Sequence, residues 1–423
     1  MAKEEKKAPK LRFNGYTNDW ERKKLGILIT RVKSYPLSRS VEVKKETDVK
    51  YVHYGDIHTN IADEIDKNNN LPFINEIYKE YDELKLDDVI VADASEDYKG
   101  IADAAVIISN LPYTIIAGLH TIALRPTSLI KGYFLYHIFK TENFKRFGYK
   151  IGTGLKVFGI SYNNLAKYKV YYPQEIEEQE KIIGILSNLT NSINLHERKC
   201  EELTLIKQAL LQKLFPKKDK VRPEVRYKNF SDAWEQRKLN NFLETSKLKN
   251  LNHKFKKEDI LSVSGDYGIV NQMEFQGRSF AGASLKNYRV VEKQNVVYTK
   301  SPLKANPYGI IKANKGNKGI VSTLYAVYKT KGDVSANFVE YYFANNYRLN
   351  AYLKPIVNKG AKNTILISDD NAINGKVIFP LDHVEQKKIG AFLVDFDSLI
   401  TLHQGKLEKL KKMKKFLLQN MFI

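Results

Sequence analysis

Two long stretches of this chain are copies of one another, and this duplication restricts the possible folds more than any other feature of the sequence. Residues 178–215 align without a gap on residues 385–422, with 16 of the 38 positions identical. Neither copy contains a proline, and mostly apolar residues recur in both at alternating steps of four and three. Each copy therefore predicts one amphipathic helix about 57 Å long, whose apolar stripe requires a partner. The obvious partner is the other copy, paired antiparallel.

The stripe has the period of a coiled-coil seam. The only cysteine, Cys200, falls on it, which indicates a small buried residue rather than a nucleophile and excludes an intramolecular disulfide. His196 and His403 are equivalent in the two copies, so a two-fold axis would place them near each other. The residues predicted to pair the helices are Ile182, Leu186, Leu189, Ile193, His196, Leu203, Leu210, Ile389, Leu393, Phe396, Ile400, His403, Leu410 and Leu417.

A second repeat precedes each long helix. Residues 9–25 align without a gap on residues 223–239, and these segments contain both tryptophans of the chain, Trp20 and Trp234. The chain thus runs twice through the same order, which is a tryptophan segment, a variable block and a long helix. Such a chain is predicted to be one duplicated scaffold that holds two different modules.

The variable blocks, residues 26–170 and 240–377, show little similarity to each other. If a pseudo-two-fold axis relates the halves, the N-terminal segment lies beside the end of the second helix, so Leu11 and Phe422 are expected to be neighbours. The predicted divisions are residues 1–173 for the first module, 174–222 for the central helix and linker, 223–380 for the second module, and 381–423 for the C-terminal helix.

Each long helix begins with the same pattern, P-x(4)-EQ-x-KI. It is supplied by Pro173, Glu178, Gln179, Lys181 and Ile182, and again by Pro380, Glu385, Gln386, Lys388 and Ile389. With the tryptophan segments at the right distances, the whole chain resembles the specificity subunit of Type I restriction-modification systems. The resemblance implies two target recognition domains, each reading one half of a bipartite asymmetric DNA site, and long helices that space them and dock methyltransferase subunits.

The same resemblance implies partners that carry the chemistry. Two modification subunits would bind S-adenosylmethionine and methylate adenine, and two restriction subunits would use ATP and Mg²⁺ to translocate and cut DNA. No cofactor is expected in this chain itself.

The charge of the chain lies in the modules. Lysine and arginine number 69 against 48 aspartate and glutamate, a net charge of +21. Residues 216–381 carry 29 basic and 14 acidic residues, and residues 1–174 carry 27 and 22, so the two helical segments together are nearly neutral. Folded modules that contact DNA phosphates need such an excess. A generally lysine-rich composition is the alternative explanation.

Both modules show strand patterns with one amphipathic helix, which favours the α+β class. We therefore expect two α+β domains joined by two long antiparallel helices. The predicted strands are residues 41–45, 49–57, 104–109 and 120–126 in the first module and 259–264, 295–301, 308–313 and 321–330 in the second, with helices at 129–141 and 335–353.

The most basic window of the chain is residues 286–318, where eight lysines or arginines stand against Glu292 alone. Lysines neutralise phosphates, and asparagine amides can read adenine edges. A solvated lysine-rich hairpin is the alternative interpretation. The residues predicted to bind DNA are Lys286, Arg289, Lys300, Lys304, Asn306, Tyr308, Lys312, Lys315 and Lys318, with weaker candidates in the first module at Arg31, Lys33, Arg39, Lys44 and Lys45.

Catalytic motifs are incomplete. Asn110-Leu-Pro-Tyr113 is similar to the N-P-P-Y box of amino-methyltransferases, but no glycine loop for S-adenosylmethionine accompanies it, and Glu42-Val-Lys44 is at most half of a nuclease motif. There is no G-x-x-x-x-G-K-[ST] phosphate loop, and the histidines lack metal-ligand spacing. No catalytic or metal-binding residue is predicted.

No apolar run reaches the roughly 18 residues of a membrane span, and the first ten residues lack the apolar core of a signal peptide, so a soluble cytoplasmic protein is expected. The predicted function is non-catalytic DNA recognition within a restriction-modification complex. The alternatives are a stand-alone DNA methyltransferase or nuclease, and a coiled-coil scaffold whose modules bind RNA.

Overall fold

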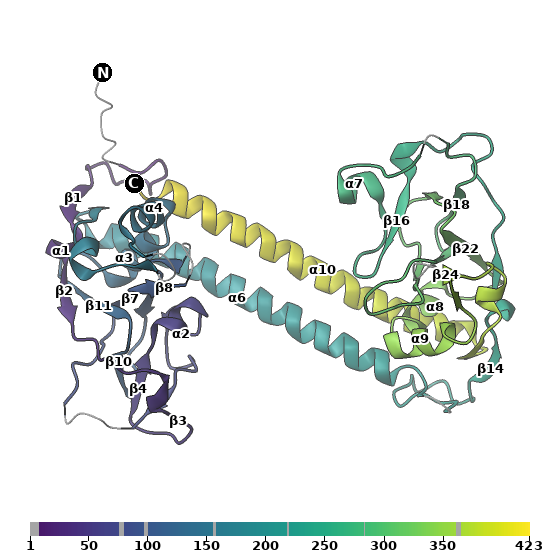
Figure 1. Ribbon diagram of the computed structural model, residues 1–423, viewed down its shortest axis with the longest axis horizontal. Helices are drawn as coiled ribbons and strands as arrows, with labels where there is room; N and C mark the ends of the chain where they lie inside the picture. Colours follow the sequence, from purple (N-terminus) through teal and green to yellow (C-terminus); the bar gives the residue numbers. More distant parts are fainter. Residues whose placement is uncertain are drawn as a thin grey trace. The chain divides into compact units, whose positions relative to one another are not determined.

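The computed structural model of the chain divides into two compact units (Figure 1). Unit 1 comprises Met1–His196 and Lys406–Ile423, and unit 2 comprises Glu197–Gly405. Each unit therefore contains one module together with one part of each long helix. The residues that the structure describes are 8–75, 80–96, 100–154, 158–217, 220–282, 284–360 and 365–423.

The two predicted long helices are confirmed, displaced by two residues from the predicted ranges. Helix α6 spans Ile176–Lys213 and helix α10 spans His383–Asn420, 38 residues each. Along both helices the seam positions are buried or half-buried. Among the described residues, no helix is both long enough and apolar enough to cross a bilayer.

Each unit holds the same antiparallel contact between the long helices. In unit 1, the Lys414 ammonium donates a hydrogen bond to the Thr190 hydroxyl at 2.7 Å. In unit 2, Lys207 forms an ion pair with Asp397. Because Thr190 and Asp397 are equivalent in the repeat, as are Lys207 and Lys414, the contact is duplicated with the sequence. The predicted proximity of His196 and His403 joins one unit to the other and stays a prediction.

The tryptophan segments are fastened to the helices by buried ion pairs. In unit 1, Arg12 Nε and Nη2 donate to the two carboxylate oxygens of Glu178 at 2.7 and 2.8 Å, and Trp20 Nε1 donates to the same carboxylate at 3.3 Å. In unit 2, Arg226 binds Glu385 with the same two distances. Each carboxylate is 1% exposed, and the hydrogen bond to Glu178 raises the pKa of Arg12. The repeated glutamate is thus an anchor for the segment that precedes the module.

The glutamine that follows this glutamate fixes the start of the long helix and the start of a module helix. Gln179 Nε2 donates to the Pro173 carbonyl at 2.9 Å, and its Oε1 accepts from the Lys131 backbone N–H at 2.8 Å. Gln386 makes the equivalent pair of hydrogen bonds in unit 2. Both glutamines are fully buried, so the repeated EQ pair is explained by folding.

The predicted proximity of the two ends of the chain is confirmed. The Leu11 N–H donates to the Asn420 carbonyl at 2.9 Å, and the equivalent bond in unit 2 joins the Val225 N–H to the Lys213 carbonyl at 3.0 Å. The Phe422 ring lies 5.3 Å from that of Phe134 in the core of unit 1. In both units, the tryptophan segment therefore lies beside the C-terminal end of a long helix.

Unit 1 contains two main sheets. The five-stranded sheet has the order β2-β11-β7-β9-β5 and the four-stranded sheet the order β10-β4-β6-β3, while β1 pairs with β13 and β8 with β12. The strands are β1 Glu21–Lys24, β2 Ile29–Val32, β3 Glu42–Val43, β4 Val49–Val52, β5 Glu64–Ile65, β6 Phe73–Ile74, β7 Val89–Ala92, β8 Ala94–Ser95, β9 Ala104–Ile107, β10 Thr114–Ala117, β11 Thr121–Pro126, β12 Phe158–Gly159 and β13 Lys169–Tyr172. The helices are α1 Leu25–Leu28, α2 Tyr54–His58, α3 Gly132–Phe139, α4 Glu142–Ile151 and α5 Tyr162–Leu165.

Unit 2 is built around a four-stranded sheet of order β15-β22-β19-β20. Among the described residues of this unit, two-stranded pairs accompany it, namely β14 with β25, β16 with β17, β18 with β21 and β23 with β24. The strands are β14 Glu235–Lys238, β15 Leu243–Thr245, β16 Leu261–Ser264, β17 Gly268–Asn271, β18 Arg289–Val291, β19 Val296–Thr299, β20 Ile310–Ala313, β21 Gly319–Val321, β22 Tyr325–Thr330, β23 Asn358–Lys359, β24 Ile365–Leu366 and β25 Lys376–Phe379. The helices are α7 Gln272–Gln276, α8 Ala336–Tyr342 and α9 Asn346–Leu353.

Four predicted elements were wrong in their extent. The strand predicted at 41–45 is only β3, Glu42–Val43, and Val41 belongs to the short helix Arg39–Val41 that precedes it. The strand predicted at 49–57 ends at Val52, because the backbone N–H of His53 donates to the Asp56 carboxylate in a capping box that starts α2. The strand predicted at 321–330 is two strands separated by a turn at Ser322. The helix predicted at 335–353 is α8 and α9, because the Asn345 side chain caps a new helix through the Arg348 N–H.

The core of unit 1 contains a histidine that carries a testable pH dependence. His137 of α3 is fully buried, stacks on Tyr133 at 4.9 Å, and has no hydrogen-bond partner for either ring nitrogen among the described residues. Burial, with Lys414 and Lys140 nearby, holds its pKa well below the ordinary value. The folded unit therefore keeps His137 neutral, whereas the unfolded chain binds a proton below about pH 6.5.

We expect the stability of the protein to fall as pH decreases below about 6.5, with His137 contributing a slope of up to about 1.4 kcal/mol per pH unit. His137→Phe, which keeps an aromatic ring, should lower this slope by up to the contribution of one bound proton. Denaturant unfolding at several pH values measures this. An identical pH profile for the two proteins would show that His137 is accessible to protons in the folded state.

Candidate nucleic-acid interface

The basic window of residues 286–318 is not a single exposed hairpin. It passes through β18, β19 and β20, and β18 pairs with β21 while β19 lies between β22 and β20. The window therefore crosses the interior of unit 2, and its cations divide into a paired and an exposed group.

Two of the predicted cations neutralise one internal carboxylate. Lys300 Nζ lies 2.5 Å from Asp369 Oδ1, and Arg289 forms an ion pair with Asp369 Oδ2 and donates to the Ser246 carbonyl at 3.2 Å. The Asp369 side chain is largely buried. Because Asp369 neutralises both cations, Arg289 and Lys300 stabilise the fold of unit 2, a role that a count of charges in the sequence does not reveal.

Two further lysines surround a buried glutamate of α8. Lys315 Nζ lies 3.0 Å from Glu340 Oε2 and donates to the Tyr341 hydroxyl at 3.0 Å, and Lys312 Nζ lies 3.9 Å from Glu340 Oε1. Burial lowers the pKa of Lys312. Lys312 is therefore held inside the unit, where its ammonium does not face the phosphates of a bound DNA.

The predicted polar readers are also engaged in the loop that joins β19 to β20. The Asn306 side chain is buried and donates to Asn346 Oδ1 at 3.0 Å. The Tyr308 carbonyl accepts a hydrogen bond from the Tyr298 hydroxyl at 2.7 Å. The next residue, Gly309, has φ of +94°, and a Cβ there would lie 2.0 Å from a backbone oxygen, so only glycine fits. Asn306 and Tyr308 thus shape this loop.

Other lysines of unit 2 are exposed to solvent. Lys286, Lys304 and Lys318 are exposed and form no ion pair with any described residue. Sequence reasoning missed a second group in unit 2, in residues 247–257, where five lysines occur with no acidic residue. These lysines are also exposed and unpaired within the described parts of the chain, and counting charge in shorter windows would have found them.

The unit 1 candidates lie on β2, around β3 and in the short helix Arg39–Val41. Arg39 is paired with Glu42 at 2.7 Å and with the buried Asp56 at 2.9 Å. Arg31 lies over the Tyr162 ring at 5.4 Å, and Lys33 over the Tyr35 ring at 4.9 Å. The pair that follows β3, Lys44 and Lys45, is exposed and has no ion pair with described residues.

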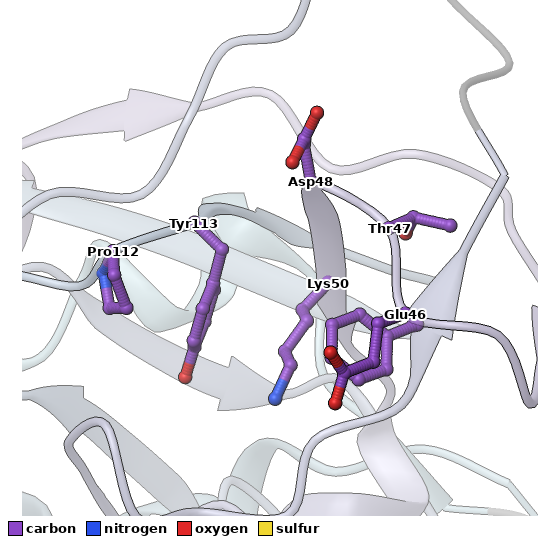
Figure 2. Close-up of a pocket in the computed structure, with 7 residues that line it drawn as sticks. Glu46, Thr47, Asp48, Lys50, Pro112 and Tyr113 are labelled. Atoms are coloured by element: carbon purple, nitrogen blue, oxygen red, sulfur yellow. The ribbon is translucent and has the colours of Figure 1, made fainter.

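A pocket of about 520 Å³ opens beside Lys44 and Lys45, lined by Glu46, Thr47, Asp48, Lys50, Phe73, Pro112 and Tyr113 (Figure 2). Lys50 is buried, with its ammonium 4.3 Å and 4.4 Å from the ring centroids of Phe73 and Tyr113, and burial lowers its pKa. Asp48 points away from that ammonium in Figure 2. Because the pocket is lined by two carboxylates, those of Glu46 and Asp48, and by only one cation, it does not suit a phosphate. Sequence reasoning did not single out Lys50.

Residues 17–205 match the family model described as the Type I restriction modification DNA specificity domain. No curated protein sequence matches the chain. The fold is similar to the crystal structure of a Type I restriction-modification S subunit from M. genitalium, with 13% identity, 98% of this chain and 99% of that chain covered, and a TM-score of 0.61. A structure of the HsdS subunit from Thermoanaerobacter tengcongensis is 15% identical, with 95% and 96% covered and a TM-score of 0.43.

Proposed function

We propose that this chain is a specificity subunit of a Type I restriction-modification system, and that each of its two modules reads one half of a bipartite, asymmetric DNA site. One observation carries the proposal: an identical anchor, with arginine on a buried glutamate, holds two modules of different topology. Equal anchors present the modules in equivalent ways. Different modules then read different sequences, which makes the site asymmetric.

Mapping modified adenines in cells that express the chain with its methyltransferase subunit tests this proposal. We expect one motif made of two short specific parts separated by a fixed gap. Exchange of the module in unit 2 should change one part only. A continuous motif, or no modification, would overturn the proposal, and preference for RNA over duplex DNA in a competition assay would favour the RNA-binding scaffold instead.

The partners in this proposal are two methyltransferase subunits, which carry S-adenosylmethionine, and two restriction subunits, which use ATP and Mg²⁺. The chain itself contributes recognition and no catalysis. Exposed apolar residues on the long helices support the two-fold stoichiometry. Unit 1 exposes Leu195 and Met413, and unit 2 exposes their repeat equivalents, Leu402 and Ile206. Duplicate apolar positions suit two copies of one protein partner.

Charged substitution of one apolar pair should remove one methyltransferase subunit. We expect Leu402→Glu with Ile206→Glu to leave one bound methyltransferase per chain, because the pair in unit 1 is unchanged, and all four substitutions to leave none. Native mass spectrometry measures the ratio. Full occupancy after all four substitutions would place docking elsewhere. The matched control is Leu366→Glu, an exposed apolar residue of β24 and not of a long helix.

Phosphate contact by unit 2 is assigned to the exposed cations. Replacing Lys286, Lys304 and Lys318 with methionine should weaken DNA binding and lower the slope of log K against log salt by up to about one for each lost contact. Titrations at several salt concentrations measure the slope. An unchanged slope would remove these lysines from the interface. Lys312→Met is the contrasting variant, since its paired ammonium should affect folding of unit 2 with no change in slope.

A further inference from the structure

The β16–β17 hairpin, α7 and the loop that follows α7 form one small substructure of unit 2, marked in Figure 1 by the labels β16 and α7. Four large apolar side chains of this substructure are exposed. Tyr267 is 69% exposed, Phe280 60%, Phe275 46% and Met273 38%. We call these four residues the aromatic cap. None of them belongs to a hydrophobic core of the described residues, so folding gives no reason for them.

The turn of the hairpin holds Tyr267 outward by defined hydrogen bonds. The Ser264 hydroxyl accepts from the backbone N–H groups of Asp266 at 3.3 Å and Tyr267 at 3.2 Å. The next residue, Gly268, has φ of +72°, a conformation that glycine adopts without strain. Tyr267 is therefore presented at the tip of a built turn.

Helix α7 and its following loop are fixed to the same hairpin. The Asn271 side chain caps α7 through the Met273 N–H at 2.9 Å. Gln272 Nε2 donates to the Ser262 hydroxyl at 2.9 Å, and Gln272 Oε1 accepts from the Phe280 N–H at 2.9 Å. One glutamine thus ties both α7 and Phe280 to strand β16.

The rings of the cap are arranged in two contacts. The Tyr267 and Phe275 rings lie 5.1 Å apart, and the Arg278 guanidinium lies 4.6 Å from the centroid of the Phe280 ring. An aromatic face with a cation beside it is suited to a planar, electron-rich partner next to an anion.

The surroundings of the cap are basic. Lys254, Lys256 and Lys257 lie on the segment that precedes β16, and the Asn271 side chain donates to the Glu258 carbonyl at 2.6 Å, which joins that segment to α7. These lysines are exposed and unpaired among the described residues, while the hairpin and α7 that carry the cap contain the acidic residues Asp266 and Glu274. Lysine is depleted at protein–protein interfaces, whereas a phosphate backbone requires cations beside any apolar contact. The charge therefore favours a nucleic acid over a protein.

We propose that the aromatic cap inserts into duplex DNA, with Tyr267 and Phe280 stacking on bases at a locally unstacked step and the neighbouring lysines holding the flanking phosphates. The inference rests on the proposed function and extends it: unit 2 reads the deformability of its half-site as well as its base edges. Apolar side chains that insert between base steps are a known means of bending DNA, and a two-stranded ribbon is of a size that a groove admits. Flexible pyrimidine–purine steps should be preferred under the cap.

The test uses the full-length chain and a duplex that carries the site found by methylation mapping, with 2-aminopurine placed at successive positions of the half-site that unit 2 reads. We expect the wild-type chain to raise the 2-aminopurine fluorescence at one step. Tyr267→Ala with Phe280→Ala should abolish that rise and weaken binding by at least about 5-fold, the smallest loss expected when one stacking contact is removed. Tyr267→Phe with Phe280→Tyr should retain both effects, because the ring faces remain.

The matched control is Tyr347→Ala, which removes a 72% exposed aromatic ring from α9 and should change neither readout. Equal affinity and fluorescence for the double alanine variant would overturn the inference. A second contradicting outcome is that the double alanine variant loses affinity although the wild-type chain causes no rise in fluorescence, because the rings would then contact base edges without stacking. A third is that the double alanine variant loses only methyltransferase binding, which would make the cap a protein-docking surface. Absence of any bipartite methylation motif would instead defeat the proposed function.

Discussion

Arg226→Met should lower the free energy of unfolding of unit 2 by about 3 kcal/mol, because it leaves a buried carboxylate without its counter-charge. Glu385 is 1% exposed, and both of its oxygens accept hydrogen bonds from Arg226. Burial of an unpaired carboxylate is costly, whereas the intact pair adds little beyond what a hydrophobic pair would give. In a common Trp20→Phe background, Trp234 is the only tryptophan, so its fluorescence during urea unfolding reports on unit 2.

Two further variants separate this explanation from a general loss of arginine. Arg237→Met removes a pair with Glu235 in which both side chains are more than 40% exposed, and should change stability by no more than about 1 kcal/mol. Arg226→Met combined with Glu385→Met should recover much of the loss, because no unpaired charge remains. If the single and double variants were equally unstable, packing around Arg226 would be responsible and the buried charge would not.

The scaffold was predictable because its signals are local or repeated. A long heptad seam fixes a helix without knowledge of what lies next to it, and the duplication shows where the pattern begins and ends. The position of Leu11 beside the end of α10 followed from repeat order alone, and the hydrogen bond to Asn420 confirms it. The role of Gln179 was not predictable, because its partners are backbone groups, which every residue has.

Inside the modules, side-chain caps explain two of the wrong predictions. Residues 335–353 keep an apolar helical period across the break between α8 and α9, so periodicity alone predicts one helix. The Asn345 side-chain oxygen accepts a hydrogen bond from the Arg348 N–H, which starts the new helix α9. His53 and Asp56 similarly turn the end of a strand pattern into α2. Hydrogen bonds from short polar side chains to the backbone compete with the hydrogen bonds of helices and strands. Which of the two forms depends on the surrounding packing, and a sequence pattern does not describe that packing.

The basic window shows why charge counting locates a DNA surface poorly. Asp369, the partner of Lys300, and Glu340, the partner of Lys312, both lie outside the window in sequence. A count within the window therefore omits the carboxylates that neutralise these cations. The same limit hid the aromatic cap. Tyr267 and Phe280 are ordinary apolar residues in the sequence, and only the structure reveals that they are exposed.

Shortening both long helices by one heptad should move the two half-sites closer without changing their sequences. Deleting residues 197–203 from α6 and the equivalent residues 404–410 from α10 removes about 10 Å of helix from each, which corresponds to about three base pairs of DNA. Seven residues are close to two full turns, so the seam keeps its face to within about 20°. Mapping modified adenines in cells that carry the variant measures the gap directly.

The position of these deletions makes the test selective. They lie between the two duplicated helix contacts, so Thr190 can still meet Lys414, and Lys207 can still meet Asp397. Deleting the heptad from α6 alone leaves helices of unequal length, in which both contacts cannot form together, and that variant should lose modification activity. An unchanged gap in the double deletion would mean that DNA bending or a partner subunit sets the spacing. Altered half-site sequences would mean that the helices also control how the modules fold.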